Sequence, residues 1–215
     1  MRLYTYHRSS ASYRVRIALE WKGLAREDVH IDLGRDEQFA PEFLAENPNG
    51  RVPFLVDGDV RLGQALAILE YLEECHPEPP LLPRSSAARA HARELALLIV
   101  ADTQPLQNTG PFSYLADPLG VTDPDRIRWY RHWVSRGLGV FERLLASSSE
   151  TGRFCVGDEP SLADVCVVPQ VVNWLRNSGG DLADWPTLSR VFDTCQALEA
   201  FQRAAPERQP DAPGS

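Results

Sequence analysis

Four prolines fall within eight residues in the segment His76-Pro77-Glu78-Pro79-Pro80-Leu81-Leu82-Pro83. Proline fixes φ and lacks a backbone N–H, so a segment this rich in proline cannot continue a helix or a central strand. Before this segment the apolar spacing switches between the strand and helix periods, whereas after it only the helix period occurs. We therefore predict an α/β domain over residues 1–80, a linker, and an all-helical domain over residues 84–205.

The predicted elements of residues 1–80 follow one another in the order β-α-β-α-β-β-α. Two-residue alternation indicates the strands, and apolar residues three and four apart indicate the helices. Asp57-Gly58 is typical of a tight hairpin between the last two strands. The predicted strands cover residues 3–6, 29–31, 52–56 and 60–62, and the predicted helices cover residues 12–22, 41–45 and 65–74.

Residues 84–205 show helical spacing throughout. A first helix is predicted over residues 87–103, and Pro105 should kink or end it. Thr122 and Asp123 can cap a second helix that is entered through Pro124. Its expected buried stripe consists of Ile127, Tyr130, Val134, Leu138, Phe141 and Leu145. Two further helices are predicted, one opened by the capping-box variant Ser161-Leu162-Ala163-Asp164 and one from Trp185 to about Phe201. Residues 206–215 have the composition of a disordered tail.

The charge and the cysteines exclude several classes of function. With 30 acidic and 22 basic residues the formal net charge is −8, which disfavours binding to nucleic acids or anionic membranes. No run of about 18 apolar residues occurs, and the N-terminus lacks the order of a signal peptide. The four cysteines form no CxxC pair and have no His at metal-ligand spacing. We therefore expect a cytoplasmic protein with structural thiols, no metal site, and no nucleic-acid or membrane partner.

A serine cluster, Ser9-Ser10-Ala11-Ser12, joins the first predicted strand to the first predicted helix and is flanked by Arg8 and Arg14. Backbone amides and hydroxyls at a helix N-terminus favour anions and stabilise a thiolate over its thiol. Plain helix capping by serine is the alternative interpretation. Three serines between two arginines exceed what capping requires, so we regard this segment as a candidate anion or thiolate site.

Two further positions are candidate ligand contacts. Val52-Pro53 leads into a strand, where a cis peptide bond would let the Val52 backbone pair with an extended, peptide-like ligand. An ordinary edge-strand proline is the alternative. Gln64 stands at the entry of a helix, where its side chain and the first amides of the helix can hold a carboxylate.

Several motifs occur together with their spacing intact, and they span nearly the whole chain. On these motifs the chain resembles the glutathione transferase superfamily, the zeta class in particular, and within it the bacterial maleylpyruvate and maleylacetoacetate isomerases. The matching segments are Ser9 to Leu19, Asn47-Pro48-x-Gly50-x-Val52-Pro53, Ala67-Ile68-x-Glu70-Tyr71-Leu72-Glu73-Glu74, Gly157-Asp158-x-Pro160-Ser161-Leu162-Ala163-Asp164, Val168-Pro169-Gln170 and the stretch from Phe201 to Pro210.

The resemblance implies a thioredoxin-like domain that binds glutathione, followed by an all-helical substrate domain, in a homodimer. In such isomerases a thiolate adds to an electron-poor maleyl carbon, the resulting single bond rotates, and elimination releases the trans acid. The protein supplies a low thiol pKa and cations for the substrate carboxylates.

The same resemblance implies roles for individual residues. Ser9, Ser10 and Arg8 are the expected catalytic residues. The expected glutathione contacts are Ser9, Ser10, Gln38, Val52, Pro53, Gln64, Ala65 and Gln104. The expected substrate contacts are Arg8, Asn108, Thr109 and Arg176, although Arg176 can also be read as a solvated helix charge.

The chain departs from the zeta pattern at Ala11, where Cys is usual, and at Ala65, where Ser is usual. It also lacks the His and Arg expected between Gln104 and Thr109, and the basic or His residue expected at Gln38. These departures leave two alternatives open: a repurposed enzyme of a biosynthetic pathway that acts on a larger conjugated compound, or a non-catalytic binding protein. We favour a glutathione-dependent isomerase or transferase of a small unsaturated carboxylic acid, because a scaffold would not need the serine cluster.

Overall fold

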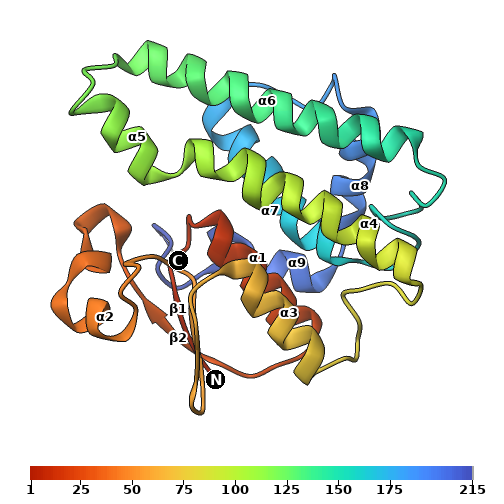
Figure 1. Cartoon of the computed structure of the whole chain (residues 1–215), viewed down its shortest axis with the longest axis horizontal. Coiled ribbons are helices and arrows are strands. Elements are labelled where there is room, and N and C mark those ends of the chain that lie inside the picture. The colour runs from red at the N-terminus through yellow and green to blue at the C-terminus, as the bar shows by residue number, and fades with distance from the viewer. Residues whose placement is uncertain (215) are drawn as a thin grey trace. The chain divides into compact units, whose positions relative to one another are not determined.

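The computed structural model describes residues 1–214, and the chain forms two compact units (Figure 1). The first, here called the sheet unit, comprises Met1–Leu81 together with the segment from Gln196 onward. The second, the helical unit, comprises Leu82–Cys195. The change from one unit to the other falls inside the proline-rich segment, but residues 196–205 pack with the sheet unit and not with the helical domain to which the sequence assigned them.

A four-stranded mixed sheet forms the centre of the sheet unit, with strand order β2-β1-β3-β4. Its strands are β1 (Arg2–Thr5), β2 (Glu27–His30), β3 (Phe54–Asp57) and β4 (Val60–Leu62). β1 pairs in parallel with β2, and in antiparallel fashion with β3, so that Tyr4 lies opposite Phe54. β3 and β4 form the predicted hairpin. β3 begins at Phe54, two residues later than predicted, which agrees with the missing N–H of Pro53.

The helices of this unit are α1 (Ser10–Trp21), α2 (Pro41–Glu46), α3 (Ala65–Cys75) and α9 (Glu199–Ala204). Up to α3, the element order is the predicted β-α-β-α-β-β-α. α1 packs beside α3 (Figure 1), and Leu3 of β1 is fully buried. The next residue, Tyr4, points to the opposite face of the sheet, where its ring centre lies 5.3 Å from that of Phe43 in α2. Both faces of the sheet are therefore covered.

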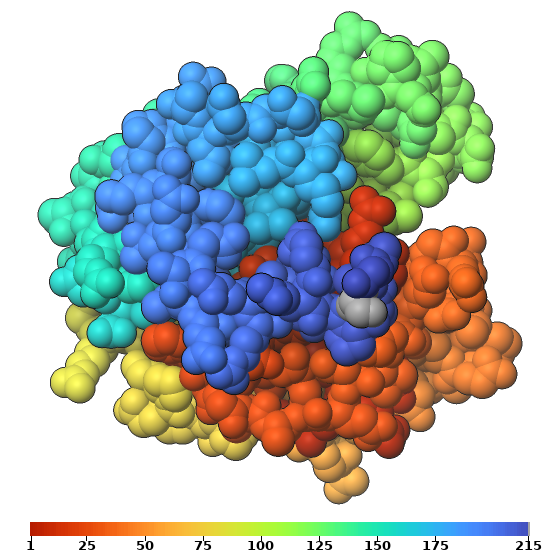
Figure 2. Space-filling model, turned by 180° about the vertical axis from the view of Figure 1, so that it is seen from behind, coloured from red at the N-terminus to blue at the C-terminus, as the bar shows by residue number. Residues whose placement is uncertain are grey.

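The C-terminal segment returns to α1 through two hydrogen bonds to backbone carbonyls. Tyr13 Oη donates to Phe201 O at 3.1 Å, and Arg16 Nε donates to Ala204 O at 3.0 Å. The dark-blue end of the chain accordingly lies against red N-terminal residues in Figure 2. Residues 206–214, whose composition predicts disorder, instead contain a 3₁₀ turn at Pro206–Arg208 and a buried Gln209.

The helical unit contains α4 (Ser86–Leu97), α5 (Thr109–Ala116), α6 (Asp123–Ser147), α7 (Leu162–Ser178) and most of α8 (Pro186–Gln196). The helix predicted over residues 87–103 is α-helical only to Leu97 and continues as a π-helical segment, Leu98–Thr103. A Cβ at Gly137 of α6 would overlap the Thr103 side chain, so glycine allows the two segments to approach closely. α5 was not predicted, and the last predicted helix is divided into α8 and α9.

The predicted cap of α7 is confirmed, and so is Thr122 of α6, whereas Asp123 is the first residue of α6 and not its cap. The Thr122 side chain accepts from Asp125 N, and Ser161 forms a capping box with Asp164. Five residues of the predicted α6 stripe are buried, but the sixth, Ile127, is 46% exposed, so that part of the prediction is wrong. Within residues 1–214, no helix is both long enough and apolar enough to cross a membrane.

Candidate active site

The strand pairing brings four loops to one end of the sheet. β1 and β2 run in parallel and end there, so the residues after Thr5 and after His30 emerge at that end. β3 is antiparallel to β1 and begins there, directly after Val52-Pro53. β4 is antiparallel to β3 and ends there, directly before Gly63-Gln64. The topology therefore gathers the predicted contacts of the sheet unit from well-separated parts of the chain.

The serine cluster opens α1 at this end of the sheet. Ser9 is the N-cap residue, and its Oγ accepts a hydrogen bond from Ser12 N at 3.1 Å. The hydroxyl hydrogen of Ser9 is not used by this bond and can donate to a ligand. Ser10 is the first residue of the helix and is buried, whereas Arg8 is exposed. A hydroxyl donor at a helix N-terminus is an arrangement that stabilises a thiolate or another anion.

The loop before β3 is held by Asn47, which is buried. Its Nδ2 donates to Arg51 O at 2.7 Å, and its Oδ1 accepts from Asn49 N at 3.2 Å. Gly50 has φ +58°, and a Cβ at this position would lie 3.1 Å from Gln38 O. The Val52-Pro53 peptide bond is cis, as predicted. Val52 thus occupies a loop with a defined backbone path.

Gln38 and Gln64 offer polar groups near this loop end. Gln38 is buried, and its Nε2 donates to Asp36 Oδ1 at 3.1 Å, while its Oε1 has no hydrogen-bond partner among residues 1–214. Gln64 is the N-cap residue of α3, but its exposed side chain makes no capping hydrogen bond. Ala65 follows as the first residue of α3 and is buried. The first amides of α3 therefore lack a side-chain cap from Gln64.

The remaining predicted contacts lie in the helical unit. Gln104 is the first residue of a short 3₁₀ turn, Gln104–Gln107, that follows the π-helical segment. Trp129 Nε1 of α6 donates to Leu106 O at 2.7 Å and holds this turn. Asn108 is the N-cap residue of α5 without a side-chain capping bond, and Thr109 is the exposed first residue of that helix.

Arg176 lies in the last turn of α7 and is exposed. It acts electrostatically on Tyr130 of α6: burial raises the pKa of Tyr130, whereas Asn177 and the Arg176 charge lower it. The ring of Phe112, in the first turn of α5, has its centre 6.3 Å from that of Tyr130. The start of α5 and the end of α7, with Thr109 and Arg176, therefore both lie near Tyr130.

Comparisons with known proteins give the family. Two family models match, "Glutathione S-transferase, N-terminal domain" over residues 1–74 and "Glutathione S-transferase, C-terminal domain" over residues 134–199. The chain is 46% identical to a "Probable maleylacetoacetate isomerase" of Vibrio cholerae, over 98% of this chain and 97% of that relative. It is 38% identical to "Glutathione S-transferase Z1" of Arabidopsis thaliana, over 100% of this chain and 96% of the relative. The chain belongs to the zeta class of the glutathione S-transferases.

Solved zeta-class structures share the whole fold. A bacterial maleylpyruvate isomerase superposes with a TM-score of 0.95 at 40% identity, covering 99% of this chain and 100% of that one. A maleylacetoacetate isomerase of Methylobacterium extorquens, solved with bound malonate and glutathione, gives a TM-score of 0.96 at 43% identity and full coverage of both chains.

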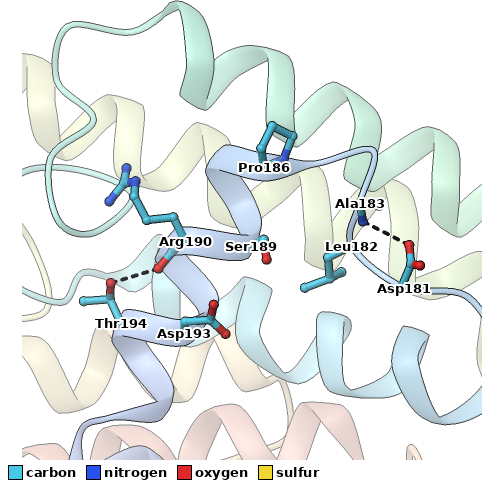
Figure 3. Close-up of a pocket in the computed structure, with 8 residues that line it drawn as sticks. All are labelled: Asp181, Leu182, Ala183, Pro186, Ser189, Arg190, Asp193 and Thr194. Atoms are coloured by element: carbon cyan, nitrogen blue, oxygen red, sulfur yellow. Dashed lines mark hydrogen bonds between the residues drawn. The ribbon is translucent and has the colours of Figure 1, made fainter.

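A hollow of this zeta-class chain lies on the helical unit around α8 (Figure 3). It has a volume of about 740 Å³ and is wide open to solvent. Polar groups in it bond to one another: Thr194 Oγ1 donates to Arg190 O at 2.8 Å, and Ala183 N donates to Asp181 Oδ1 at 3.0 Å. None of the predicted site residues lines it, so we assign no function to it.

Sequence reasoning missed the residues that bind the backbone of the turn leading into the serine cluster. Arg16 and His7 lie within or next to the recognised motif, but no pattern indicated that they bind backbone groups and the C-terminal segment. Asp211 was placed in a tail of disordered composition, although it contacts His7. The resemblance of the stretch from Phe201 to Pro210 to bacterial isomerases was the one available signal. Among residues 1–214, no group of three or more His, Cys, Asp or Glu side chains is placed to hold a metal ion.

Proposed function

We propose that this zeta-class enzyme is a glutathione-dependent cis–trans isomerase of a small unsaturated dicarboxylic acid of the maleylacetoacetate or maleylpyruvate type. The observation that carries the proposal is the Ser9 hydroxyl, which caps α1 and keeps its own hydrogen for a ligand at the end of the sheet. Relatives at 44–46% identity in Vibrio cholerae and rat carry the name maleylacetoacetate isomerase.

The residues at the end of the sheet fit glutathione, a tripeptide with two carboxylates, two amides and a thiol. Val52 supplies a backbone for pairing with the peptide, and Gln64 with the start of α3 supplies donors for a carboxylate. Gln38 supplies a buried amide with an unused acceptor, Oε1. Pro53 and Ala65 complete the walls beside Val52 and Gln64. Glutathione is accordingly the cofactor that we assign to the sheet unit.

Glutathione supplies a thiol that, once ionised, adds to the double bond of the acid and is later eliminated, so that the bond is single and free to rotate in between. The task of Ser9 and Ser10 is to keep that thiol ionised at neutral pH. They do so by hydroxyl donation and by the positive end of α1, which together lower a thiol pKa.

The substrate carboxylates require cations, because an unpaired carboxylate that leaves water is strongly disfavoured. Arg8 and Arg176 are assigned this role, since the planar guanidinium binds a carboxylate through two parallel hydrogen bonds. We assign Gln104 of the helical unit to glutathione. Asn108 and Thr109 are assigned to the substrate.

We further propose that the protein works as a homodimer in the cytoplasm, without a nucleic-acid or membrane partner. The homodimer is proposed on the membership of the chain in the glutathione S-transferases. The net charge of −8 argues against polyanionic partners. All four cysteines are free thiols in the structure, which suits a reducing compartment.

The proposal is tested by pairing two N-cap variants. Ser9→Ala removes the cap of α1 and the proposed thiolate donor, whereas Ser85→Ala removes the equivalent cap of α4, whose side chain accepts from Ala88 N at 3.1 Å. Both should cost about 1 kcal/mol of stability. Only Ser9→Ala should lower kcat for glutathione-dependent isomerisation of maleylacetoacetate, on the order of 10²-fold. If the wild type turns over neither maleyl acid, with or without glutathione, the isomerase assignment is wrong.

A further inference from the structure

The carboxylate of Asp211, near the end of the chain, binds the residue that leads into the serine cluster. Its Oδ2 accepts a hydrogen bond from His7 N at 2.8 Å and lies 3.3 Å from His7 Nδ1. Its Oδ1 lies 3.2 Å from Nδ1 of His30, at the end of β2. The side chains of Asp211 and His7 are only 16% and 10% exposed, so these contacts are largely shielded from water.

The backbone of this turn is held from the other side by Arg16 of α1, which is fully buried. Arg16 Nη1 donates to Tyr6 O at 3.2 Å, and Nη2 donates to His7 O at 3.1 Å. Ser9 N in turn donates to Tyr6 O at 3.1 Å. Within residues 1–214, Asp211 therefore supplies the acceptor for the His7 amide, in a turn whose neighbouring carbonyls are already bound by Arg16 and Ser9.

The charge of Arg16 is a second reason for Asp211 to lie beside this turn. Burial lowers the pKa of Arg16 to about 10, and the negative charge of Asp211 acts most strongly in the opposite direction. A buried guanidinium without a compensating charge is costly. Asp211 is thus the main counter-charge for the cation that organises the turn.

Hydrogen bonds within the C-terminal segment hold Asp211 near this turn, and they do not depend on its contact with His7. Gln209 is buried, and its Nε2 donates to Arg203 O and Ala205 O, each at 2.9 Å. Ala212 N donates to Gln209 O at 3.0 Å and closes a turn around Asp211. The C-terminal strap, residues 205–214, therefore keeps its own anchors when the Asp211 side chain is removed.

We propose that Asp211 is a positioning residue for the active site, which fixes the turn from Tyr6 to Ser9 and so aims the Ser9 hydroxyl at the thiol. This inference rests on the proposed function for its effect on the thiol, but not for its effect on the turn. It gives the C-terminal strap a role in the reaction, although no atom of the strap is assigned to touch glutathione or substrate.

The test compares Asp211→Ala with Glu207→Ala, which removes the same charge from an exposed position of the same strap. A chain that ends at Pro210 with an amidated C-terminus removes the carboxylate without adding a new one, and it keeps the Gln209 anchor. Asp211→Asn keeps an acceptor for His7 N. Hydrogen exchange at the His7 and Ser9 amides reports the turn, and exchange at Leu55 of β3 reports global unfolding. Thiolate absorbance against pH reports the pKa of the bound glutathione thiol.

We expect Asp211→Ala and the shortened chain to speed exchange at His7 and Ser9 by about tenfold relative to Leu55. The pKa of the bound thiol should rise by about one, and kcat at neutral pH should fall about tenfold and recover as pH is raised. Asp211→Asn should restore most of the protection, and Glu207→Ala should match the wild type.

Equal exchange at His7 and Ser9 in Asp211→Ala, the shortened chain and Glu207→Ala would overturn the proposal. Faster exchange without a change in the thiol pKa would also overturn it, because the turn would then be fixed without consequence for the reaction. If Asp211→Ala does not fold, amide exchange and the thiol pKa measured in the shortened chain decide whether the proposal holds. If the wild type binds no glutathione, the proposed function fails, and the exchange data still decide whether Asp211 fixes the turn.

Discussion

Lys22 Nζ lies 2.8 Å from Glu73 Oε2, and neither side chain is more than 9% exposed. The same ammonium donates to His76 O at 2.6 Å and to Pro79 O at 2.9 Å, and Glu73 also accepts from Leu81 N at 2.9 Å. This pair therefore ties the proline-rich segment to α1 and α3. Lys22 is the only lysine of the chain, and its compact group with three donors suits three separate acceptors better than the planar fork of arginine.

We expect Lys22→Met to lower the free energy of unfolding by about 3–5 kcal/mol, because it leaves the Glu73 carboxylate buried without its partner. Urea unfolding measures this change. Arg61→Met is the control, since it breaks the Arg61–Glu46 pair, whose side chains are 52% and 40% exposed, and should cost less than about 1 kcal/mol. A Lys22→Met chain as stable as Arg61→Met would contradict the structural role of the buried pair.

The thiols should divide into two classes. Cys75 is exposed, whereas Cys155, Cys166 and Cys195 are buried. Burial, reinforced by the charge of Asp164, raises the pKa of Cys155 and Cys195. A thiol reagent should therefore modify Cys75 rapidly in the native protein, and the three buried thiols only after unfolding. The variant Cys75→Ser should lack the rapid phase of modification. Two or more rapid groups at neutral pH would contradict the burial.

The same pKa shifts predict a loss of stability in alkali. A folded thiol whose pKa is raised keeps its proton, whereas the unfolded thiol ionises near its ordinary pKa of about 8.5. The unfolded state then binds fewer protons than the folded state, so the free energy of unfolding falls as pH rises through this range. Urea unfolding between about pH 7.5 and 9.5 measures the slope, and Cys195→Ala should make it shallower. An unchanged slope in this variant would show that Cys195 does not contribute.

Elements with local chemical signals could be predicted from the sequence. The caps at Thr122 and Ser161 and the hairpin at Asp57-Gly58 depend on residues a few positions apart. α5 could not be predicted in this way, because Gly110 and Pro111 fall in its first turn and indicate a loop. The return of the C-terminal segment depends on Tyr13 and Arg16, which bind carbonyls 188 residues away. Composition carries no information about such distant partners, so it indicated disorder for the residues after Ala205.

The candidate site likewise contains residues that a local motif predicted and residues that only the structure revealed. The motifs indicated Ser9, Val52 and Gln64, and the strand register explains why they lie at one end of the sheet. Asp211 is separated from His7 by 204 residues, and a single aspartate in a proline-rich tail has no local pattern. Long-range contacts that position a loop are therefore the part of the site that required the structure.

Ala65→Ser should strengthen glutathione binding. Ala65 is the first residue of α3, where a serine hydroxyl would add one hydrogen bond to a carboxylate held by Gln64. Such a charge-assisted bond contributes about 1.5–3 kcal/mol, which corresponds to roughly ten- to a hundredfold in affinity. Calorimetric titration measures it, and Ala67→Ser, at an exposed position of the same helix, is the control. Low-micromolar binding by the wild type, unchanged in Ala65→Ser, would show that Ala65 is not a defect.

The last prediction separates the substrate from the cofactor. Arg176 lies in the last turn of α7, where its charge acts on Tyr130, and Arg8 precedes the serine cluster. If each guanidinium holds one carboxylate of the acid, Arg8→Ala and Arg176→Ala should each lower kcat/KM for maleylacetoacetate or maleylpyruvate on the order of 10²-fold, since a lost bidentate pair leaves that carboxylate uncompensated. Glutathione affinity should stay nearly the same, because neither side chain is assigned to glutathione.

Arg128→Ala is the matched control, because Arg128 is an exposed arginine of α6 that pairs with Asp125 one turn away. It should leave both kcat/KM and glutathione affinity unchanged. Steady-state kinetics with each acid, together with calorimetry for glutathione, give the comparison. Full turnover of both acids by Arg176→Ala would show that Arg176 holds no substrate carboxylate. A parallel loss of glutathione affinity would instead place Arg176 with the cofactor.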